Sequence, residues 1–339
     1  MRIIYFGSNS PLSYQPLKAL LRLTQHIAAP VKFEICAIVS EHFNTEDISI
    51  IDTRSDTLQS LAFIQQIPFI KVTHNLPDIA PVLRRCKADI ILSSCFARKI
   101  PESILSIASF GAFNIHPSLL PQYRGPDPLF WQFRAEQCVF GVSLHRMTAE
   151  FDSGDILFKK TVVMPEGINR HEATYLLAHA AAELALQLLE RSLNKPPAQT
   201  PQNSKAMSHQ GLPEAKDYGV SHQWSARRLY NFICAYQQVG RYFQCHINQQ
   251  SIKLTQAFSY QKHPYAEAQN LSFKHQPFSI HPVDNTGDYD TGITPYNLRD
   301  NLRDNLRDNL RDNLRDNLRD IRIACSTGFI HCQFYSEIQ

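Results

Sequence analysis

The chain has 339 residues, of which 43% are hydrophobic and 19% charged, so it can bury a sizeable core and is long enough for two domains. Its formal net charge of +3 is too small to demand a nucleic-acid partner, although a local basic patch would still be compatible with one. No apolar run approaches the roughly 20 residues of a membrane span, and the apolar start MRIIYFG is too short for a signal peptide. We therefore expect a cytoplasmic protein without a membrane partner.

The first half of the chain alternates short apolar runs with segments of helical periodicity. The expected strands are residues 1–7, 33–40, 68–73, 88–95, 110–116 and 141–147, and the expected helices are residues 11–27, 55–67, 79–87 and 171–193. This alternation predicts the α/β class, with a Rossmann-like, mostly parallel sheet and flanking helices. Because ligands bind beyond the carboxyl ends of such strands, the segments after Gly7 and after Ser94 are candidate rims of a site.

A polar segment rich in Pro, Gln and Ser follows the last of these helices. We place a linker at residues 196–215, between a catalytic domain at 1–195 and a small β-rich domain at 216–339. The helix expected in that second domain is SARRLYNFICAY, and its expected strands are RYFQCHIN, SIKLTQAFSY, IRIACS and FIHCQFY.

Residues 297–320 are six identical copies of NLRD. In a helix the leucines would recur every four residues, so their stripe would drift by about 40° per repeat. Arg and Asp could pair along such a helix, but Asn and Asp recur in every turn and are poor helix formers. We favour a solvated, weakly ordered insertion in a loop, with an interaction helix as the alternative.

Eight cysteines are spread along the chain without a CxxC pair, and several lie in apolar runs. A metal site or a disulfide framework would need tighter clustering. We therefore predict reduced cysteines, many of them in the core, and no metal.

Three polar residues could support acyl or formyl transfer to an amine. Asn114 and His116 alternate along one expected strand and so share a face, and Asp152 lies in a turn-like FDSGD segment. An amide can stabilise an oxyanion, an imidazole can take a proton, and a carboxylate can orient that imidazole. By residue type alone this triple is weak, since such combinations occur by chance in a chain of this length.

The sequence around these residues resembles the folate-dependent formyltransferase family, which includes methionyl-tRNA, glycinamide ribonucleotide and nucleotide-sugar formyltransferases. The family signature is Asn-x-His followed by SLLP, and then an Asp after a GV-containing strand. Here these are Asn114 and His116, then residues 118–121, then Asp152 at an interval of 36 residues from His116. The resemblance implies 10-formyltetrahydrofolate as the donor and Asn114, His116 and Asp152 as catalytic residues. It also implies that the second domain is OB-like, with the NLRD repeat inserted in a loop before its last strand.

The resemblance also implies binding residues. Those expected near the folate are Cys95, Phe96, Ala97, Ile100, Pro101, Phe151, Ser153 and Gly154. Those expected toward the acceptor are Gly7, Ser8, Ser118, Leu119, Leu120, Pro121, Arg124, Gly125 and His145. For His145 a purely structural hydrogen bond is an equal alternative. The carboxylate of Asp152 is expected to favour the protonated imidazole of His116.

The acceptor is less defined than the donor. Formyltransferases acting on tRNA usually carry a Gly- and Lys-rich loop after the second strand, whereas SEHFNTEDISIIDTRSD here has more acidic than basic residues. The strand GVSLHRM resembles that of aminoarabinose and purine-type members. We favour a small or nucleotide-linked amine as the acceptor, with initiator methionyl-tRNA as the alternative and hydrolysis of the formyl-folate as a weaker one. An alternative of another class is a catalytically inactive folate- or nucleotide-binding protein.

Overall fold

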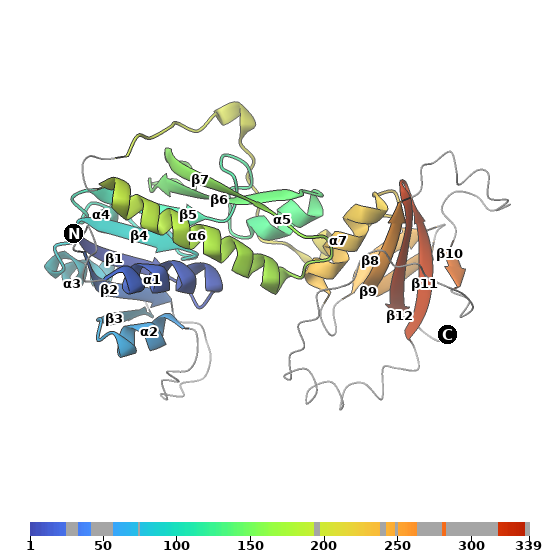
Figure 1. Ribbon diagram of the computed structural model, residues 1–339, viewed down its shortest axis with the longest axis horizontal. Helices are drawn as coiled ribbons and strands as arrows, with labels where there is room; N and C mark the ends of the chain where they lie inside the picture. Colours follow the sequence, from blue (N-terminus) through green and yellow to red (C-terminus); the bar gives the residue numbers. More distant parts are fainter. Residues whose placement is uncertain are drawn as a thin grey trace. The chain divides into compact units, whose positions relative to one another are not determined.

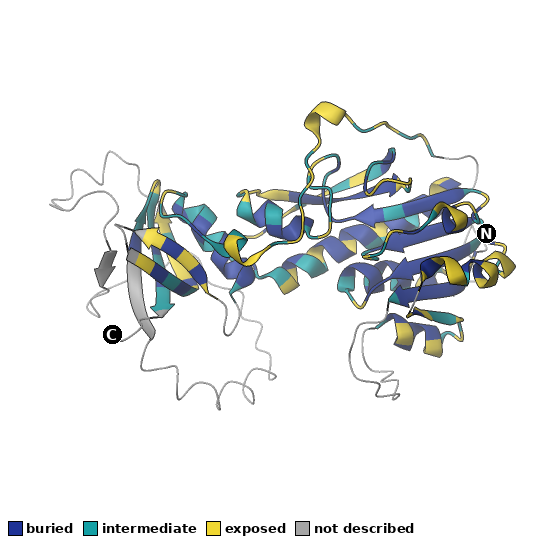
Figure 2. Cartoon of the chain, turned by 180° about the vertical axis from the view of Figure 1, so that it is seen from behind, coloured by how far each residue is buried: buried dark blue, intermediate teal, exposed yellow. Residues whose placement is uncertain are grey.

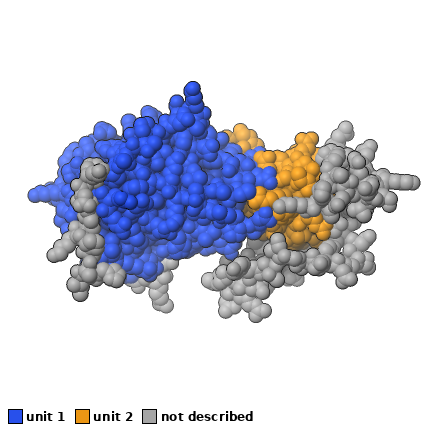
Figure 3. Space-filling view, turned by 45° about the horizontal axis from the view of Figure 1, so that its top comes forward, with its two compact units in different colours: residues 1–212 blue, residues 213–339 orange. Residues whose placement is uncertain are grey.

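The computed structural model describes residues 1–24, 33–41, 57–73, 75–192, 197–237, 242–247, 250–262, 280–282 and 318–335. The chain divides into two compact units, Met1–Leu212 and Pro213–Gln339, which Figure 3 distinguishes by colour. The division falls inside the predicted linker at 196–215, and the predicted domain limits themselves stay a prediction. Within the described residues, no helix is both long and apolar enough to cross a membrane.

The first unit is built on a seven-stranded sheet with the order β3-β2-β1-β4-β5-β6-β7. Its strands are β1 (Arg2–Gly7), β2 (Glu34–Glu41), β3 (Phe69–Val72), β4 (Ile90–Ser94), β5 (Gly111–His116), β6 (Val139–Arg146) and β7 (Ile156–Val163). The first five strands pair in parallel, and β6 and β7 add antiparallel to β5. The predicted mostly parallel, Rossmann-like sheet is thus confirmed, while β7 is a strand that the sequence pattern did not reveal.

Helices cover both faces of this sheet. They are α1 (Pro11–Thr24), α2 (Leu58–Ile64), α3 (Ala80–Arg85), α4 (Glu102–Leu105), α5 (Pro128–Arg134) and α6 (Arg170–Ser192). Helices α1 and α6 pack against each other across one face, as Figure 1 shows. On the other face, Phe6 and Ile91 belong to a core cluster with Leu83 of α3 and Ile104 of α4. The parallel strands are therefore covered on both sides, which explains their near-continuous apolar runs.

The central strands are buried along nearly their whole length, as the colouring of Figure 2 shows. Five of the six residues of β1 are buried, as are all five residues of β4. The sheet gives the site a rigid floor, because these strands cannot move without exposing the core. The carboxyl ends of β1, β4 and β5 lie next to one another in the sheet, and this is the edge where a ligand is expected.

In its described residues, the second unit has one α-helix and a five-stranded sheet in the order β10-β11-β12-β9-β8. The elements are α7 (Ala226–Tyr236), β8 (Phe243–Ile247), β9 (Gln250–Lys262), β10 (Ile280–Pro282), β11 (Leu318–Cys325) and β12 (Gly328–Tyr335). All pairings are antiparallel, so the predicted C-terminal β domain is confirmed, whereas its OB-like class stays a prediction. The predicted NLRD insertion at 297–320 lies outside the described residues, except that its last three residues begin β11.

Part of the predicted linker packs along the first unit. We call residues 200–211 the strap. Thr200 exchanges two backbone hydrogen bonds of 2.9 Å with Ile156 of β7, and Ser208 and Gln210 make backbone hydrogen bonds with Arg124. The strap therefore packs along β7 and along the loop that contains Arg124, instead of crossing open solvent as a linker would.

All eight cysteines are free, and Cys36, Cys234, Cys245 and Cys332 are buried. Burial raises the pKa of the thiols of Cys36 and Cys234 to about 12, so both stay protonated at neutral pH. Among the described residues, no group of three or more His, Cys, Asp and Glu side chains could hold a metal ion.

Candidate functional site

The site begins with a cross-strand pair. Strands β5 and β6 are antiparallel, and their register places Asn114 opposite His145. The amide Nδ2 of Asn114 donates a hydrogen bond of 3.2 Å to Nε2 of His145. The other ring nitrogen of His145, Nδ1, donates to the Arg146 carbonyl at 2.8 Å. Since a carbonyl can only accept, the ring proton lies on Nδ1, and the bare Nε2 fixes the orientation of the Asn114 amide.

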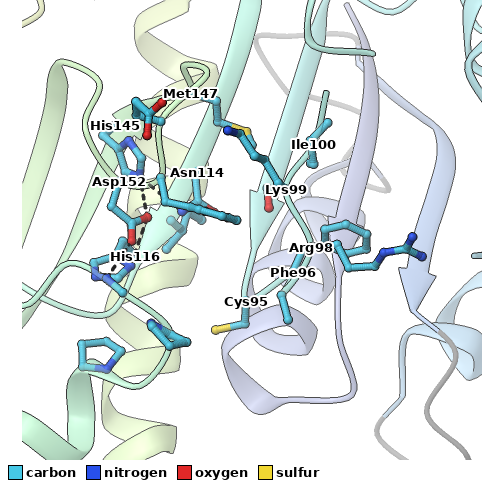
Figure 4. Close-up of a pocket in the computed structure, with 18 of the residues that line it drawn as sticks. Cys95, Phe96, Arg98, Lys99, Ile100, Asn114, His116, His145, Met147 and Asp152 are labelled. Atoms are coloured by element: carbon cyan, nitrogen blue, oxygen red, sulfur yellow. Dashed lines mark hydrogen bonds and ion pairs between the residues drawn. The ribbon is translucent and has the colours of Figure 1, made fainter. Parts of the chain in front are cut away.

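His116, at the end of β5, has a second set of partners. Its Nε2 donates to the Tyr123 carbonyl at 2.9 Å, which turns Nδ1 toward Asp152. The distance from Nδ1 to Oδ1 of Asp152 is 3.5 Å, and Nε2 of His145 lies 3.6 Å from the same oxygen. Figure 4 shows the two imidazoles on either side of the Asp152 carboxylate. Two segments 36 residues apart, the end of β5 and the turn after β6, thus bring the predicted catalytic residues together.

Asp152 is held in a strained turn. Its φ of 53° is in the left-handed region, which is uncommon for a residue other than glycine. The backbone N–H of Gly125 donates to its Oδ2 at 3.0 Å. The Gly125 N–H thus holds the carboxylate from outside the turn while the backbone of Asp152 keeps an unfavourable conformation.

The charges of the site follow from burial and pairing. Burial raises the pKa of Asp152, but His116, His145 and the Gly125 N–H stabilise the charged form more strongly, so its pKa lies well below the ordinary value. For His116, burial lowers the pKa and outweighs the opposing effect of Asp152. Asp152 thus favours the protonated imidazole, as expected, but a buried ring is costly to charge, so His116 rests in its neutral form with Nδ1 able to accept a proton.

A cavity of about 460 Å³ opens beside this cluster. Of the predicted site residues, its lining includes Asn114, His116, Asp152, Cys95, Phe96, Ala97, Ile100, Phe151, Gly125 and His145. The loops after β4 and after β6 thus meet at the catalytic cluster, as expected for the carboxyl-end rim of the sheet. Burial raises the pKa of the Cys95 thiol to about 12, with smaller contributions from Asp127 and Asp152, so Cys95 is no nucleophile at neutral pH.

Other predicted binding residues lie outside the cavity lining. They are Gly7, Ser8, Pro101, Ser118, Leu119, Leu120, Pro121, Arg124, Ser153 and Gly154. Ser118 and Leu120 have no exposed surface, and the Ser118 hydroxyl donates to the Gln122 carbonyl at 2.7 Å. In this conformation these two residues build the loop after β5 and cannot contact an acceptor.

The cavity is also lined by residues that are not among the individually predicted binding residues. Arg98, Lys99 and Met147 line it, and so does His209 from the strap. Arg98 and Lys99 lie in the loop after β4, the segment after Ser94 that the sequence predicts as a rim of the site. His209 carries no such local signal, because it reaches the site only through the pairing of the strap with Arg124.

Gly125 offers a test of the packing around Asp152. Its φ is 116°, and a Cβ at this position would collide with the backbone carbonyl of Gln210. We expect Gly125→Ala to lower the free energy of unfolding by about 1–3 kcal/mol, measured by thermal or urea denaturation. Gly211→Ala is the matched control, because nothing lies within 4 Å of its Cβ position. Equal stability of the two variants would contradict this description of the strap.

Comparisons with known proteins find relatives in both sequence and fold. Residues 1–187 match a family model described as formyl transferase. Over 241 residues, 70% of this chain and 69% of the relative, the sequence is 28% identical to the methionyl-tRNA formyltransferase of Thermosynechococcus vestitus (strain NIES-2133 / IAM M-273 / BP-1).

Two solved structures are similar in fold along nearly the whole chain. One is the N-formyltransferase of Helicobacter canadensis in complex with folinic acid and dTDP-3-aminofucose, with a TM-score of 0.60, 16% identity, and coverage of 99% of this chain and 100% of that one. The other is WlaRD, a sugar 3N-formyl transferase studied with dTDP and 5-N-formyl-THF, with a TM-score of 0.59, 15% identity, and coverage of 100% and 99%.

Proposed function

Because the chain belongs to the formyl transferase family, we propose that it transfers the formyl group of 10-formyltetrahydrofolate to the amine of a small or nucleotide-linked acceptor of the amino-sugar type. The observation that carries this proposal is the cluster of Asn114, His116 and Asp152 at the wall of the cavity. It combines an oriented amide donor, a neutral imidazole and a charged carboxylate.

The cavity fits the donor in size and chemistry. Its volume of about 460 Å³ is within the usual range of roughly 300–1,000 Å³ for small-molecule sites. Phe96, Ile100 and Met147 supply apolar surface for a flat ring system. When bound, the folate supplies an activated formyl group on N10.

Each member of the cluster then has a role in the transfer. Asn114 has one amide hydrogen on His145 and a second one for the formyl oxygen, where negative charge develops as the acceptor amine attacks. The new bond joins the amine nitrogen to the formyl carbon, and the bond from that carbon to N10 breaks. His116 Nδ1, directly or through a water, carries the proton from the amine to N10, and Asp152 stabilises the transient imidazolium.

Two observations support a nucleotide-linked acceptor. Two solved structures that match along nearly the full length of both chains are a sugar N-formyltransferase and an enzyme holding a dTDP-linked amino sugar. In addition, the acidic segment after β2 lacks the basic loop expected of an enzyme that grips tRNA. The runner-up is formylation of initiator methionyl-tRNA, which the 28% identity to a methionyl-tRNA formyltransferase favours.

The acceptor is tested by incubating the full chain and 10-formyltetrahydrofolate with a panel of nucleotide-linked amino sugars, and separately with charged initiator tRNA. We expect folate turnover, followed by absorbance, with at least one amino sugar and little with the tRNA. A mass increase of one formyl group on the sugar amine would identify the product. Faster formylation of the tRNA would reject the proposed acceptor and leave the donor chemistry intact.

A further inference from the structure

The strap carries an amide side chain that joins the two loops around Asp152. Between residues 201 and 210 most side chains are exposed, but Gln202 is half-buried. Its Nε2 donates to the carbonyl of Asp152 at 2.8 Å and to the carbonyl of Gly154 at 2.7 Å. Both amide hydrogens of Gln202 are therefore used on the turn that presents the catalytic carboxylate.

The oxygen of the same amide reaches the other loop. Gln202 Oε1 accepts from Arg124 at 3.1 Å through Nε and at 2.6 Å through Nη2. The next residue after Arg124 is Gly125, whose N–H donates to the Asp152 carboxylate. The contacts form a closed ring that runs from the Asp152 carbonyl through Gln202, Arg124 and Gly125 back to the Asp152 side chain.

This ring of contacts holds the Asp152 turn in a backbone conformation that is otherwise unfavourable. Asp152 has a left-handed φ of 53°, which costs about 1–3 kcal/mol for a non-glycine residue unless its surroundings hold it. Its carboxylate oxygen lies 3.5 Å from His116 and 3.6 Å from His145, so a small rotation of the turn would change both distances. A fixed carboxylate is what orientation of His116 requires.

We propose that Gln202 is a positioning residue for formyl transfer, which holds the Asp152 turn and the Arg124–Gly125 loop in the geometry that presents the carboxylate to His116. This inference rests on the proposed function, since it assumes that Asp152 acts on His116. Gln202 itself does not line the cavity, so it acts through Asp152 and not on a substrate.

The test uses Gln202→Met, which removes all four hydrogen bonds, and Gln202→Glu, which keeps an acceptor for Arg124 but sets a carboxylate against two carbonyls. We expect both variants to lower kcat by about 10–100-fold with little change in the KM for the folate, as is usual when a residue behind a reactive group is lost. Asn203→Ala is the matched control, because its exposed amide caps the next turn at the Lys205 N–H and touches neither loop.

The pH profile separates positioning from general structural support. Asp152 raises the pKa of His116 against the effect of burial, so a displaced carboxylate lets that pKa fall further. The acid limb of kcat/KM should then move to lower pH in both Gln202 variants, as it should in Asp152→Asn. A loss of kcat without this shift overturns the proposal.

Other outcomes are equally decisive. If Gln202→Met does not fold, Gln202→Glu decides, since the Arg124–Glu ion pair ties the strap to the loop. If Asp152→Asn is inactive while Gln202→Glu matches the wild type, the positioning proposal fails alone. If Asp152→Asn is fully active, the proposed catalytic site fails, whatever the Gln202 variants do.

Discussion

Replacing Asp152 with asparagine is expected to lower kcat for formyl transfer by about 10³-fold, within the range of roughly 10²–10⁴ for groups that serve proton transfer. Asparagine keeps the size of the side chain and an oxygen for the Gly125 N–H, so the fold should persist. What is lost is the negative charge facing His116 and His145. Without it, the imidazolium that forms during transfer has no counter-charge. The measurement is steady-state turnover of 10-formyltetrahydrofolate at saturating acceptor.

The pH dependence of the wild type and of this variant follows from the same charge. Burial places the pKa of His116 below its ordinary value of 6.5, and only the neutral ring can accept a proton. Activity of the wild type should therefore fall only as the pH drops below about 6.5. Because Asp152 raises this pKa, Asp152→Asn should shift the acid limb to still lower pH. Asp155→Asn, at a half-buried carboxylate three residues further on, is the control. A shift to higher pH, or turnover within twofold of the wild type, would reject the assigned role.

The sequence predicted the strands beneath the site better than the contacts that hold Asp152 in place. Strands β1, β4 and β5 are covered on both faces, so their apolar runs are nearly continuous and each could be recognised as a strand of a parallel sheet. The signature residues Asn114 and His116 end one of these strands, and a fixed strand end leaves little freedom in where they point. The positions of Asn114 and His116 therefore follow directly from the strand that carries them.

The supports of Asp152 depend on contacts between distant segments. The strap looked like a solvated linker because Pro, Gln and Ser are typical of exposed chain. Yet Gln202 donates to Asp152, 50 residues away in sequence, and the Ser208 hydroxyl accepts from the Tyr123 N–H, 85 residues away. Composition indicates average exposure, whereas a few specific contacts, those of the Gln202 amide and of the strap backbone, hold this segment in place. Ser118 and Leu120 were likewise assigned to the acceptor from the sequence, although packing buries both side chains within the loop after β5.

Loss of the Asn114 amide is the second large expected effect. Asn114→Ala should lower kcat by about 10²–10³-fold, the usual consequence of removing one oxyanion donor. The KM for the folate should change little, because the hydrogen bond to the formyl oxygen strengthens as charge develops. The variant is compared with Ser93→Ala, which changes another polar side chain of the cavity wall on β4. Turnover of Asn114→Ala close to that of Ser93→Ala would exclude an oxyanion role for the amide.

A variant of His145 tests how the loss of activity in Asn114→Ala arises. It accepts from Asn114 Nδ2 and donates to the Arg146 carbonyl, so its contribution through Asn114 is to fix the direction of that amide. His145→Leu should therefore cost less than Asn114→Ala, about tenfold in kcat, because the donor remains but is no longer held. The double variant should be no slower than Asn114→Ala alone, since the two residues act as one unit. Additive losses would instead mean that His145 has its own contact with the reactants, which is the acceptor-side role that the resemblance suggested for it.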